Sequence, residues 1–419
     1  MADAYIIDAV RTPRGIGKVG KGALAHLHPQ HLGATVLKAL AERNNLNTED
    51  VDDVVWGTSS QEGKHGGDLG RMALLAAGYD TKASGVTLDR FCGSGITTVN
   101  MAAASIMSGM EDLVIAGGTQ MMSETATQSR EKMEKGVAVY GMGAGNAALD
   151  EMHPQTHQGI GADAIAASEG ISREDLEALG LESQRRAAIA IEEGRFDNSV
   201  VPVYNEDGSV ALDHEEYPRP STTAEGLAGL KPAFASIIDA DQGNGHTPRE
   251  QVKRRYPDLE FEALHHAGIS SGVVDGAAAI LLASKEYAEK HGMKPRARIV
   301  AYANMGDDPT FMLNAPVPAA KKVLAKAGLS KDDIDVYEVN EAFAVVTEKF
   351  IRDMDVPREK VNPNGGSIAL GHPIGATGSM LIGTALDELE RTGGRYGLIT
   401  MCAGGGMAPA VIIERVDAA

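Results

Sequence analysis

Hydrophobic and polar positions follow two patterns along this chain, one typical of buried strands and the other of helices. Short aliphatic runs predict strands that are buried on both faces of a sheet. These runs are 4–10 (AYIIDAV), 85–88, 113–118 and 277–283. Longer runs with helical spacing predict helices at 35–42, 96–107, 173–194, 321–328 and 379–389. Alternating strands and helices indicate an α/β protein with mixed or parallel sheets covered by helices.

Two distant parts of the chain have similar sequences. Segment 46–54 (LNTEDVDDV) is similar to 329–336 (LSKDDIDV), and 329 − 46 gives an offset of 283. Each segment follows an amphipathic run and predicts a capped turn that leads into a short buried strand. Nearly the same offset pairs 113–118 (LVIAGG) with 398–404 (LITMCAG). This agreement favours a duplicated β/α unit over the alternative that α/β turns merely resemble one another.

Between the two similar parts the composition changes. Residues from about 119 to 266 are richer in charge, Met, Gly and Pro, and an aliphatic strand pattern returns after 268. The simplest organisation is two similar halves with a long insertion in the first. We therefore expect a first half made of 1–118 and 268–290, an inserted domain at 119–267 and a second half at 291–419.

The charge balance excludes several kinds of partner. Among 419 residues, 39 Lys and Arg stand against 58 Asp and Glu, so 39 − 58 gives a formal net charge of −19. Nucleic acids and anionic membrane surfaces require a basic footprint, so neither is an expected partner. No apolar run reaches the ~18 residues of a membrane span. The N-terminus reads as a strand rather than as a targeting segment, which predicts a cytoplasmic protein.

The chain contains two cysteines, Cys92 and Cys402. Two thiols cannot form a disulfide framework, and they indicate a reducing compartment. The histidine pairs at 28/31 and 265/266 have no third ligand nearby in the sequence. We read them as loop or surface residues, and no metal site is predicted.

Cys92 lies where the strand at 85–88 leads through a turn (LDRFCGSG) into the apolar run 96–107. Free backbone N–H groups and the positive end of the helix dipole favour the thiolate there, which is the nucleophilic form. The flanking glycines let a substrate approach the backbone. The alternative is a small cysteine that only packs a crowded helix start.

His372 and Cys402 lie in glycine-rich turns of the second half. The offset of 283 carries Cys92 to Gly375, within the loop 362–378 that contains His372. An imidazole there can act as a base for a thiol or as a donor to a carbonyl oxygen; the alternative is a structural histidine. Cys402 follows a strand in TMCAGGGM, where glycines leave backbone N–H groups open to a ligand. We expect the three loops to converge on one pocket.

Several motifs together resemble those of the thiolase family. They are IDAVRTPRG near the N-terminus, LDRFCGSG around Cys92, NEAFA at 340–344, NPNGGSIALGHPIGATG around His372 and CAGGG at Cys402. The resemblance extends over essentially the whole chain. It implies an α/β protein with a duplicated thiolase fold of five layers, α/β/α/β/α, and a loop domain inserted in the first half. It also implies an acyltransferase that acts on CoA thioesters.

The resemblance implies a role for each residue that matches a family motif. Cys92 is implied to be acylated, and His372 to activate it and to help polarise the substrate carbonyl. Cys402 is implied to move the proton at the α-carbon of the acetyl-CoA unit. Asn340 is implied to hold a water in one oxyanion hole, and Gly404 to form a second hole with the Cys92 backbone N–H.

CoA is expected to bind the inserted domain as a substrate, with no permanently bound cofactor. The resemblance implies that Arg219 packs on the adenine, that Phe234 and His157 lie along the pantetheine tunnel, and that Ser271 lies near it. The charged segment 235–266, with Arg249 and KRR at 253–255, is expected to contact CoA phosphates or a partner subunit, or to form a solvated helix.

The chain departs from the family's pattern in three places. Gln158 stands where Met is common, which predicts a different shape and polarity of the acyl pocket. Ile269 replaces the usual Asn of an AGN stretch. Ala408 and Pro409 replace the glycine that closes the second cysteine motif, so the backbone path there is expected to differ.

The predicted reaction is thiolytic cleavage of 3-ketoacyl-CoA through a Cys92 acyl-enzyme in fatty-acid β-oxidation, because 235–266 resembles the thiolase subunits of bacterial β-oxidation complexes. The alternative is a biosynthetic thiolase that condenses two acetyl-CoA. A remote alternative is a serine hydrolase, since GISSG at 268–272 matches a nucleophile elbow with Ser270 as the nucleophile. The expected partners are acyl-CoA and CoA, a second copy in a homodimer or tetramer, and a β-oxidation multienzyme partner.

Overall fold

The computed structural model describes residues 3–137, 141–241 and 245–416. Within these residues, ten strands form one mixed sheet in the order β10-β11-β12-β9-β1-β8-β5-β3-β4, with β2 beside β8, and β6 pairs with β7 separately. The strands are β1 (Ala4–Arg11), β2 (Gly15–Ile16), β3 (Asp53–Gly57), β4 (Ser84–Leu88), β5 (Leu113–Met121), β6 (Val203–Tyr204), β7 (Val210–Leu212), β8 (Val274–Ser284), β9 (Ala297–Gly306), β10 (Val336–Val339), β11 (Tyr396–Thr400) and β12 (Met407–Arg415).

Helices precede and follow these strands, as the sequence pattern predicts. The α-helices are α1 (Pro29–Arg43), α2 (Leu69–Ala76), α3 (Ser94–Ser108), α4 (Met122–Glu134), α5 (Ala147–Met152), α6 (Gln158–Glu169), α7 (Arg173–Glu192), α8 (Ala224–Ala228), α9 (Pro248–Arg255), α10 (Lys285–Lys290), α11 (Pro316–Ala327), α12 (Ala344–Met354), α13 (Ser367–Leu370) and α14 (Ile374–Thr392). Short 3-10 helices are η1 (Thr48–Asp50), η2 (Gly63–His65), η3 (Ala267–Ile269), η4 (Lys331–Asp333) and η5 (Arg358–Lys360). None of the helices in these ranges combines the length and apolarity needed to cross a bilayer.

The two ends of the sheet repeat one topology, which confirms the predicted duplication. In the first half, β3 is parallel to β4 and β5, and β8 and then β1 follow antiparallel. In the second half, β10 is parallel to β11, and β12 and then β9 follow antiparallel. A parallel bridge between Tyr337 and Val361 stands where β4 stands in the first half. The two similar sequence segments form η1 with β3 and η4 with β10.

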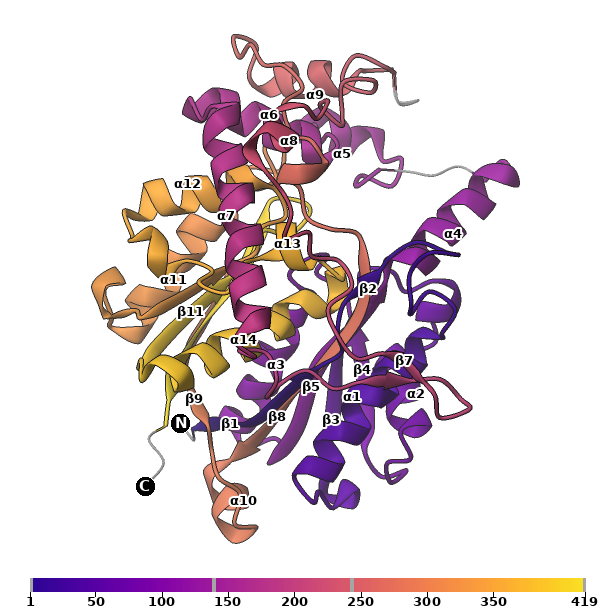
Figure 1. Ribbon diagram of the computed structural model, residues 1–419, viewed down its shortest axis with the longest axis vertical. Helices are drawn as coiled ribbons and strands as arrows, with labels where there is room; N and C mark the ends of the chain where they lie inside the picture. The colour runs from indigo at the N-terminus through magenta and orange to yellow at the C-terminus, as the bar shows by residue number, and fades with distance from the viewer. Residues whose placement is uncertain (1–2, 138–140, 242–244, 417–419) are drawn as a thin grey trace.

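The helices arrange the two halves into the predicted five layers. Helices α3 and α14 pack on each other between the halves, whereas α1 and α2 cover the outer face of the first half. Helices α11 and α12 cover the outer face of the second half. Figure 1 shows the first half in indigo and the second in orange and yellow, on opposite sides of the molecule. Two residue pairs between β1 and β9 join the halves edge to edge.

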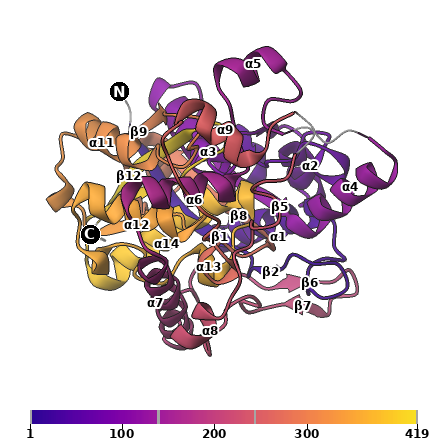
Figure 2. The same cartoon turned by 90° about the horizontal axis from the view of Figure 1, so that it is seen from above.

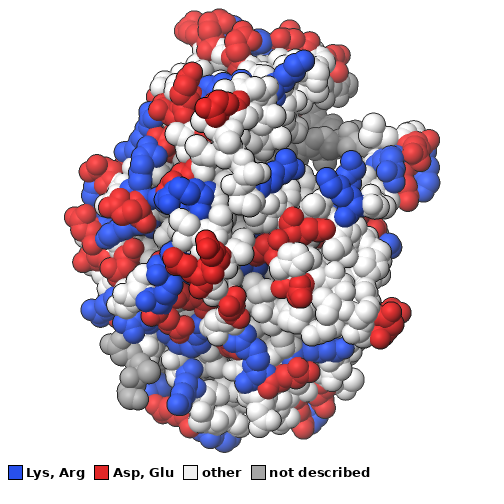
Figure 3. All heavy atoms as spheres, in the orientation of Figure 1, with Lys and Arg blue, Asp and Glu red and all other residues white. Residues whose placement is uncertain are grey.

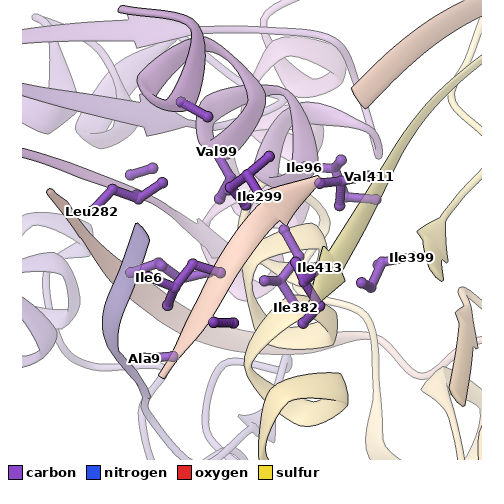
Figure 4. Packing of buried hydrophobic residues seen from close by; sticks show 14 of the residues in the cluster. Ile6, Ala9, Ile96, Val99, Leu282, Ile299, Ile382, Ile399, Val411 and Ile413 are labelled. Carbon is purple, nitrogen blue, oxygen red and sulfur yellow. The ribbon is translucent and has the colours of Figure 1, made fainter. Parts of the chain in front are cut away.

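Apolar side chains from both halves fill the layer around α3 and α14. Figure 4 shows this cluster in close-up. Its members include Ile6, Ile96, Val99, Leu282, Ile299, Ile382, Ile399, Val411 and Ile413, all at most 1% exposed. Each buried aliphatic side chain contributes roughly 1.5–3 kcal/mol relative to an exposed one. The cluster therefore stabilises the docking of one half on the other.

The starts of α3 and α14 cross at two glycines. A Cβ atom on Gly378 would lie 2.2 Å from the backbone nitrogen of Ile96, and one on Gly95 would lie 2.7 Å from that of Ser379. The Ser379 hydroxyl donates to the Gly95 carbonyl oxygen at 2.9 Å. Because no side chain separates the two backbones, the turns that precede the two helices lie next to each other.

The segment between β5 and β8 forms α4 to α9 with the β6–β7 pair. Most of these helices gather at one end of the molecule, and α4 projects from it (Figure 1). Seen from that end, they lie over the sheet ends (Figure 2). Helix α6 packs on α12, and α7 packs on α12 and α13. The inserted segment thus shares one apolar cluster with the second half.

We predict that Gly378→Ala lowers the free energy of unfolding by about 3 kcal/mol or more, because the added methyl group meets backbone atoms that cannot move aside. Without such a collision, Gly→Ala inside a helix raises the free energy of unfolding by about 1 kcal/mol. A decrease therefore indicates the collision. Denaturant unfolding measures the change. Gly306→Ala is the control, since a Cβ there meets no atom within 4 Å. An unchanged midpoint for Gly378→Ala would contradict the close crossing.

Candidate active site

His372 lies in the turn before α14, and its hydrogen bonds define its tautomer. The Thr377 hydroxyl donates to the Pro373 carbonyl oxygen at 3.1 Å and lies 2.6 Å from His372 Nδ1. Since its single hydrogen is used on Pro373, the hydroxyl accepts from Nδ1–H. Nε2 therefore carries no hydrogen and can accept one. The His372 backbone N–H donates to the Gly272 carbonyl oxygen at 2.9 Å, which fixes the turn.

Asn340 faces the free nitrogen of His372 from the end of β10. Its Nδ2 lies 3.4 Å from His372 Nε2, and its Oδ1 accepts from the Ser367 hydroxyl at 2.5 Å. The bond from Ser367 orients the amide, so that Nδ2–H points towards the imidazole. The Asn340 backbone N–H donates to the Thr400 carbonyl oxygen at 3.2 Å, which continues the β10–β11 pairing to this residue. The sheet end thus positions the Asn340 side chain.

The imidazole of His372 is neutral. It is 5% exposed, and burial, with a smaller effect of the Arg14 guanidinium, lowers its pKa to about 3. A buried imidazole resists a positive charge because low-polarity surroundings disfavour the charged form. His372 is therefore a neutral base at physiological pH, with its lone pair at Nε2.

Cys92 lies in a tight turn just before α3. Phe91 adopts a left-handed backbone conformation with φ +49, and its N–H donates to the Asp89 carboxylate at 2.6 Å. Burial raises the pKa of the Cys92 thiol to about 12, although its own backbone N–H opposes this. The backbone N–H favours the thiolate as expected, but desolvation outweighs it, so the net shift favours the neutral thiol. A base must take the proton before Cys92 can act as a nucleophile.

Cys402 lies two residues beyond β11, and its turn touches that of Cys92. A Cβ on Gly93 would lie 2.8 Å from Pro409 Cδ and 3.4 Å from Ala403 Cβ. Burial raises the pKa of the Cys402 thiol, and so does the nearby Cys92 sulfur. The two sulfurs are thus close enough for charge on one to disfavour charge on the other. Pro409 continues β12 in register with Asn304 of β9, so the departure there leaves the strand intact.

Gly404 is buried beside the Cys92 turn. A Cβ on it would lie 2.4 Å from Met142 Cε and 3.2 Å from Phe91 Cγ. The residue before Cys92 thus packs on the backbone of Gly404. The structure brings Gly404 to the Cys92 turn, as expected for a residue that shares a site with its backbone N–H.

His157 and Phe234 lie together in an aromatic row that continues to Phe343. The His157 ring is 5.0 Å from that of Phe234, which is 6.1 Å from that of Phe343, centroid to centroid. Phe343 and Cys402 belong to one apolar cluster. Gly159 allows the close approach, since a Cβ there would lie 2.0 Å from Phe234 Cε2. The aromatic row thus ends at Phe343, which shares its apolar cluster with Cys402.

Ser271 and Arg219 are linked by contacts of their neighbours. The Ser271 N–H donates to the Ala342 carbonyl oxygen at 2.9 Å, two residues from Asn340. Arg219 is exposed, and its guanidinium lies over the Tyr217 ring at 5.8 Å. The Tyr217 ring packs on Gly272, where a Cβ would lie 2.2 Å from Cε1. Arg219 is therefore connected to Ser271 through Tyr217.

Three basic residues of α9 pair with neighbouring carboxylates. Arg249 pairs with Asp239 and Glu262, Lys253 with Glu260, and Arg254 with Asp150 and Glu151. These charges are neutralised within the inserted segment, as in a solvated helix. On the face seen in Figure 3, acidic and basic side chains are interspersed, without the basic stripe that a polyanion would require.

Two sequence-based interpretations are corrected or excluded. His265 and His266 lie in a loop, as one of the two readings predicts, but they are fully buried rather than on the surface, each beside a carboxylate. The Ser270 hydroxyl donates to the His266 carbonyl oxygen at 2.9 Å, and strand β8 rather than a helix follows it. This arrangement is not the strand–turn–helix of a nucleophile elbow. Within the described ranges, no three His, Cys, Asp or Glu side chains group as metal ligands.

Sequence reasoning missed several residues that shape the site. Thr377 and Ser367, which orient His372 and Asn340, both lie in the glycine-rich motif around His372, and their position in it was the available signal. Arg14, whose positive charge lowers the pKa of His372, lies in the N-terminal motif. Phe343 belongs to NEAFA. No spacing rule would have identified their contacts, because these depend on how the halves dock.

Comparison with known proteins matches almost the whole chain. Residues 4–244 match the family model "Thiolase, N-terminal domain" and residues 293–415 match "Thiolase, C-terminal domain". A steroid 3-ketoacyl-CoA thiolase of Mycobacterium tuberculosis is 42% identical over 99% of this chain and 95% of its own. A beta-ketoadipyl-CoA thiolase of Pseudomonas aeruginosa is 41% identical over 99% of each chain. An acetyl-CoA acetyltransferase of Chromobacterium violaceum is 39% identical over 99% of this chain and 100% of its own.

The buried neutral His372 predicts a pH-dependent stability. In the unfolded chain the imidazole takes up a proton below about pH 6.5, whereas the folded pKa is about 3. Between these pH values, the unfolded chain binds a proton at His372 and the folded chain does not. The stability that the neutral imidazole contributes is therefore present above about pH 6.5 and is lost as the pH falls towards 3. From pH 7 to pH 5, wild type should lose about 2 kcal/mol relative to His372→Asn.

Denaturant unfolding at several pH values measures this difference. Thr384→Val, a buried substitution in α14 that removes no titrating group, should keep a constant difference from wild type. A pH-independent difference between His372→Asn and wild type would show that the imidazole is not held neutral.

We predict that Thr377→Val slows alkylation of Cys92 by iodoacetamide at pH 7 by about tenfold or more, because Nδ1–H loses its acceptor and Nε2 no longer stays in the base form. Peptide mapping resolves Cys92 from Cys402. Thr384→Val is the matched control, since its hydroxyl bonds to the Met380 carbonyl oxygen one turn back in the same helix. Equal rates in both variants would contradict the assigned tautomer.

Proposed function

The chain belongs to the thiolase family, and we propose that it catalyses CoA-dependent thiolytic cleavage of 3-ketoacyl-CoA to acetyl-CoA and a shortened acyl-CoA. Members of this family are acyltransferases that use CoA as a substrate. The observation that carries the proposal is the α3–α14 crossing, which brings the turn of the neutral His372 imidazole, hydrogen-bonded to Asn340, next to the turn of Cys92, whose buried thiol neighbours that of Cys402.

In the first half-reaction, Cys92 attacks the C3 carbonyl. His372 Nε2 takes the thiol proton, and the sulfur–carbon bond forms. The C2–C3 bond then breaks, and its electron pair moves to the acetyl-CoA unit as an enolate. Cys402 gives its proton to that carbon, which leaves acetyl-CoA, a Cys402 thiolate and the Cys92 acyl-enzyme. Because each thiol starts neutral, charge appears only as the substrate reacts.

In the second half-reaction, CoA removes the acyl group. The Cys402 thiolate takes the proton of the incoming CoA thiol, whose sulfur attacks the acyl carbon. The Cys92 sulfur leaves and recovers the proton held by His372, so that every group returns to its starting state. Two oxyanions form along this route, and one well-placed donor to each is worth about 3–4 kcal/mol. We assign one hole to a water on Asn340 and the other to the N–H groups of Cys92 and Gly404.

The inserted segment supplies the proposed CoA site. We propose that 119–267 binds CoA, with Arg219 at the adenine, and with Phe234, His157 and Ser271 along the pantetheine. The placement of His157 and Phe234 on an aromatic row that reaches the Cys402 cluster supports this path. Arg219 is exposed and stacks on Tyr217, an arrangement that leaves a flat cationic face open to an adenine ring.

Membership of the thiolase family determines neither the acyl group of the substrate nor whether the enzyme works towards thiolysis or condensation. Fatty-acid β-oxidation is one candidate, and the names of similar proteins refer to steroid and beta-ketoadipyl substrates instead. The second candidate function is condensation of two acetyl-CoA, which the similarity to an acetyl-CoA acetyltransferase supports. Both directions use the same residues. Thiolysis rates with acetoacetyl-CoA, 3-ketohexanoyl-CoA and longer 3-ketoacyl-CoA substrates separate these candidates.

We further propose a homodimer or tetramer in the reducing cytoplasm, with a β-oxidation multienzyme protein as a possible associate to be tested by co-purification. Both thiols must stay reduced to perform the reaction, and both are free in the structure. Sedimentation of the purified chain measures its oligomeric state.

Serine substitutions test the two thiol roles separately. Cys92→Ser should abolish acetylation by acetyl-CoA, because a serine hydroxyl loses its proton far less readily than a thiol. Cys402→Ser should still be acetylated at Cys92 but should lose thiolysis by about a hundredfold or more, since the carbanion has no thiol to protonate it. Intact-mass measurement detects the acyl-enzyme, and release of acetyl-CoA measures thiolysis. Full thiolysis by Cys402→Ser would refute its role.

A further inference from the structure

A buried acid–histidine pair lies in the inserted segment outside the proposed chemistry. Asp163 of α6 and His265, just before η3, have side chains that are both 0% exposed. Asp163 Oδ1 accepts two hydrogen bonds from His265, from its backbone N–H at 2.8 Å and from Nδ1 at 2.7 Å. Neither Asp163 Oδ2 nor His265 Nε2 has a partner among the described residues. The proposed reaction uses neither residue.

His265 connects the three segments that carry the aromatic row. Its ring meets that of Phe343 edge-on, with centroids 5.5 Å apart and planes at 83°. Its carbonyl oxygen accepts from the Ala233 N–H at 2.8 Å, which holds the residue next to Phe234. Through Asp163, it is bonded to α6, the helix that begins next to His157. His265 thus links Phe343 of NEAFA, the segment that contains Phe234, and helix α6, whose N-cap is His157.

Such a pair is costly to bury. Two polar groups leave water, and one atom of each stays without a partner among the described residues, which destabilises the folded chain. An apolar pair of similar size would pack here at no such cost. The hydrogen bonds have another effect, which is to fix the rotation of the His265 ring against Phe343. Phe343 in turn packs in the cluster that contains Cys402.

We propose that Asp163 and His265 are positioning residues that hold Phe343 and Phe234 as a rigid wall beside Cys402, and thereby set which acyl-CoA chains the site accepts. This inference rests on the proposed function, because it assigns the wall to the path of an acyl-CoA. The pair acts through the two phenylalanines and takes no part in proton transfer.

Asp163 offers a conservative and a disruptive variant. Asp163→Asn keeps an oxygen at the Oδ1 position, which can accept both bonds from His265, whereas Asp163→Ala removes the acceptor. We expect Asp163→Ala to raise KM for 3-ketoacyl-CoA about tenfold with kcat per active site changed less than about threefold. We also expect a change of about fivefold or more in the kcat/KM ratio between acetoacetyl-CoA and 3-ketohexanoyl-CoA. Asp163→Asn should resemble wild type.

His266→Ala is the matched control. His266 is the neighbouring buried histidine, and its Nε2 lies 2.9 Å from Glu177 Oε1 on α7. Its Nδ1 accepts from the Gly268 N–H at 3.1 Å, so both nitrogens have partners away from Phe343. We expect His266→Ala to leave the substrate ratio unchanged. Acetylation by acetyl-CoA, measured by intact mass, counts the active sites in every variant.

If Asp163→Ala does not yield folded protein, the double variant Asp163→Leu with His265→Phe replaces both partners by apolar side chains and is expected to show the same change of ratio. A fall in kcat that is equal for both substrates, with unchanged KM and fewer acetylated sites, would show a purely structural pair and overturn the inference. Asp163→Asn behaving like Asp163→Ala would overturn it too, as would an unchanged ratio in Asp163→Ala. A wild-type chain without thiolysis would contradict the proposed function itself.

Discussion

The contact of α3 with α14 at Gly95 and Gly378 is the constraint on which the site depends. Cys92 precedes one of these helices and His372 precedes the other, so the distance between the two turns follows from the distance between the helix starts. A side chain at either glycine would collide with the opposite backbone. The apolar cluster around both helices stabilises this arrangement, because it contains residues of both halves. Docking of the duplicated halves and assembly of the site are therefore a single event.

Burial determines how the assembled groups behave. It raises the pKa values of both thiols and lowers that of His372, so all three groups are neutral in the free enzyme. A preformed thiolate–imidazolium pair would be the alternative, and it is disfavoured because low-polarity surroundings penalise both charges. The hydrogen bonds from Ser367 through Asn340, and from His372 to Thr377, orient the acceptor nitrogen in advance. Orientation rather than charge is thus what the free enzyme provides.

The sequence was sufficient to predict the strands at 4–10, 85–88, 113–118 and 277–283, the buried helix after Cys92 and the duplication. Hydrophobic runs and a repeated offset report local structure and its repetition, and glycines mark close approaches. The protonation state of Cys92 could not be predicted in this way, because the helix start is visible in the sequence whereas desolvation depends on docking. His265 reads as a loop residue since its partner, Asp163, lies 102 residues away. Thr377 and Phe343 likewise acquire their roles only from contacts between separate elements.

In the proposed function, chemistry and selection are carried by different parts of the chain. The thiols, Asn340 and His372 lie in turns at the ends of the duplicated sheet and helices, whereas His157, Phe234 and the Asp163–His265 pair belong to the inserted segment. Phe343 touches both, because it follows Asn340 by three residues and packs against Phe234 and His265. A change of side chain in the inserted segment therefore alters the wall beside Cys402 without moving the reacting groups, which the rigid docking of α3 on α14 holds in place. Such a division allows one reaction centre to serve different acyl groups through changes in the insertion alone.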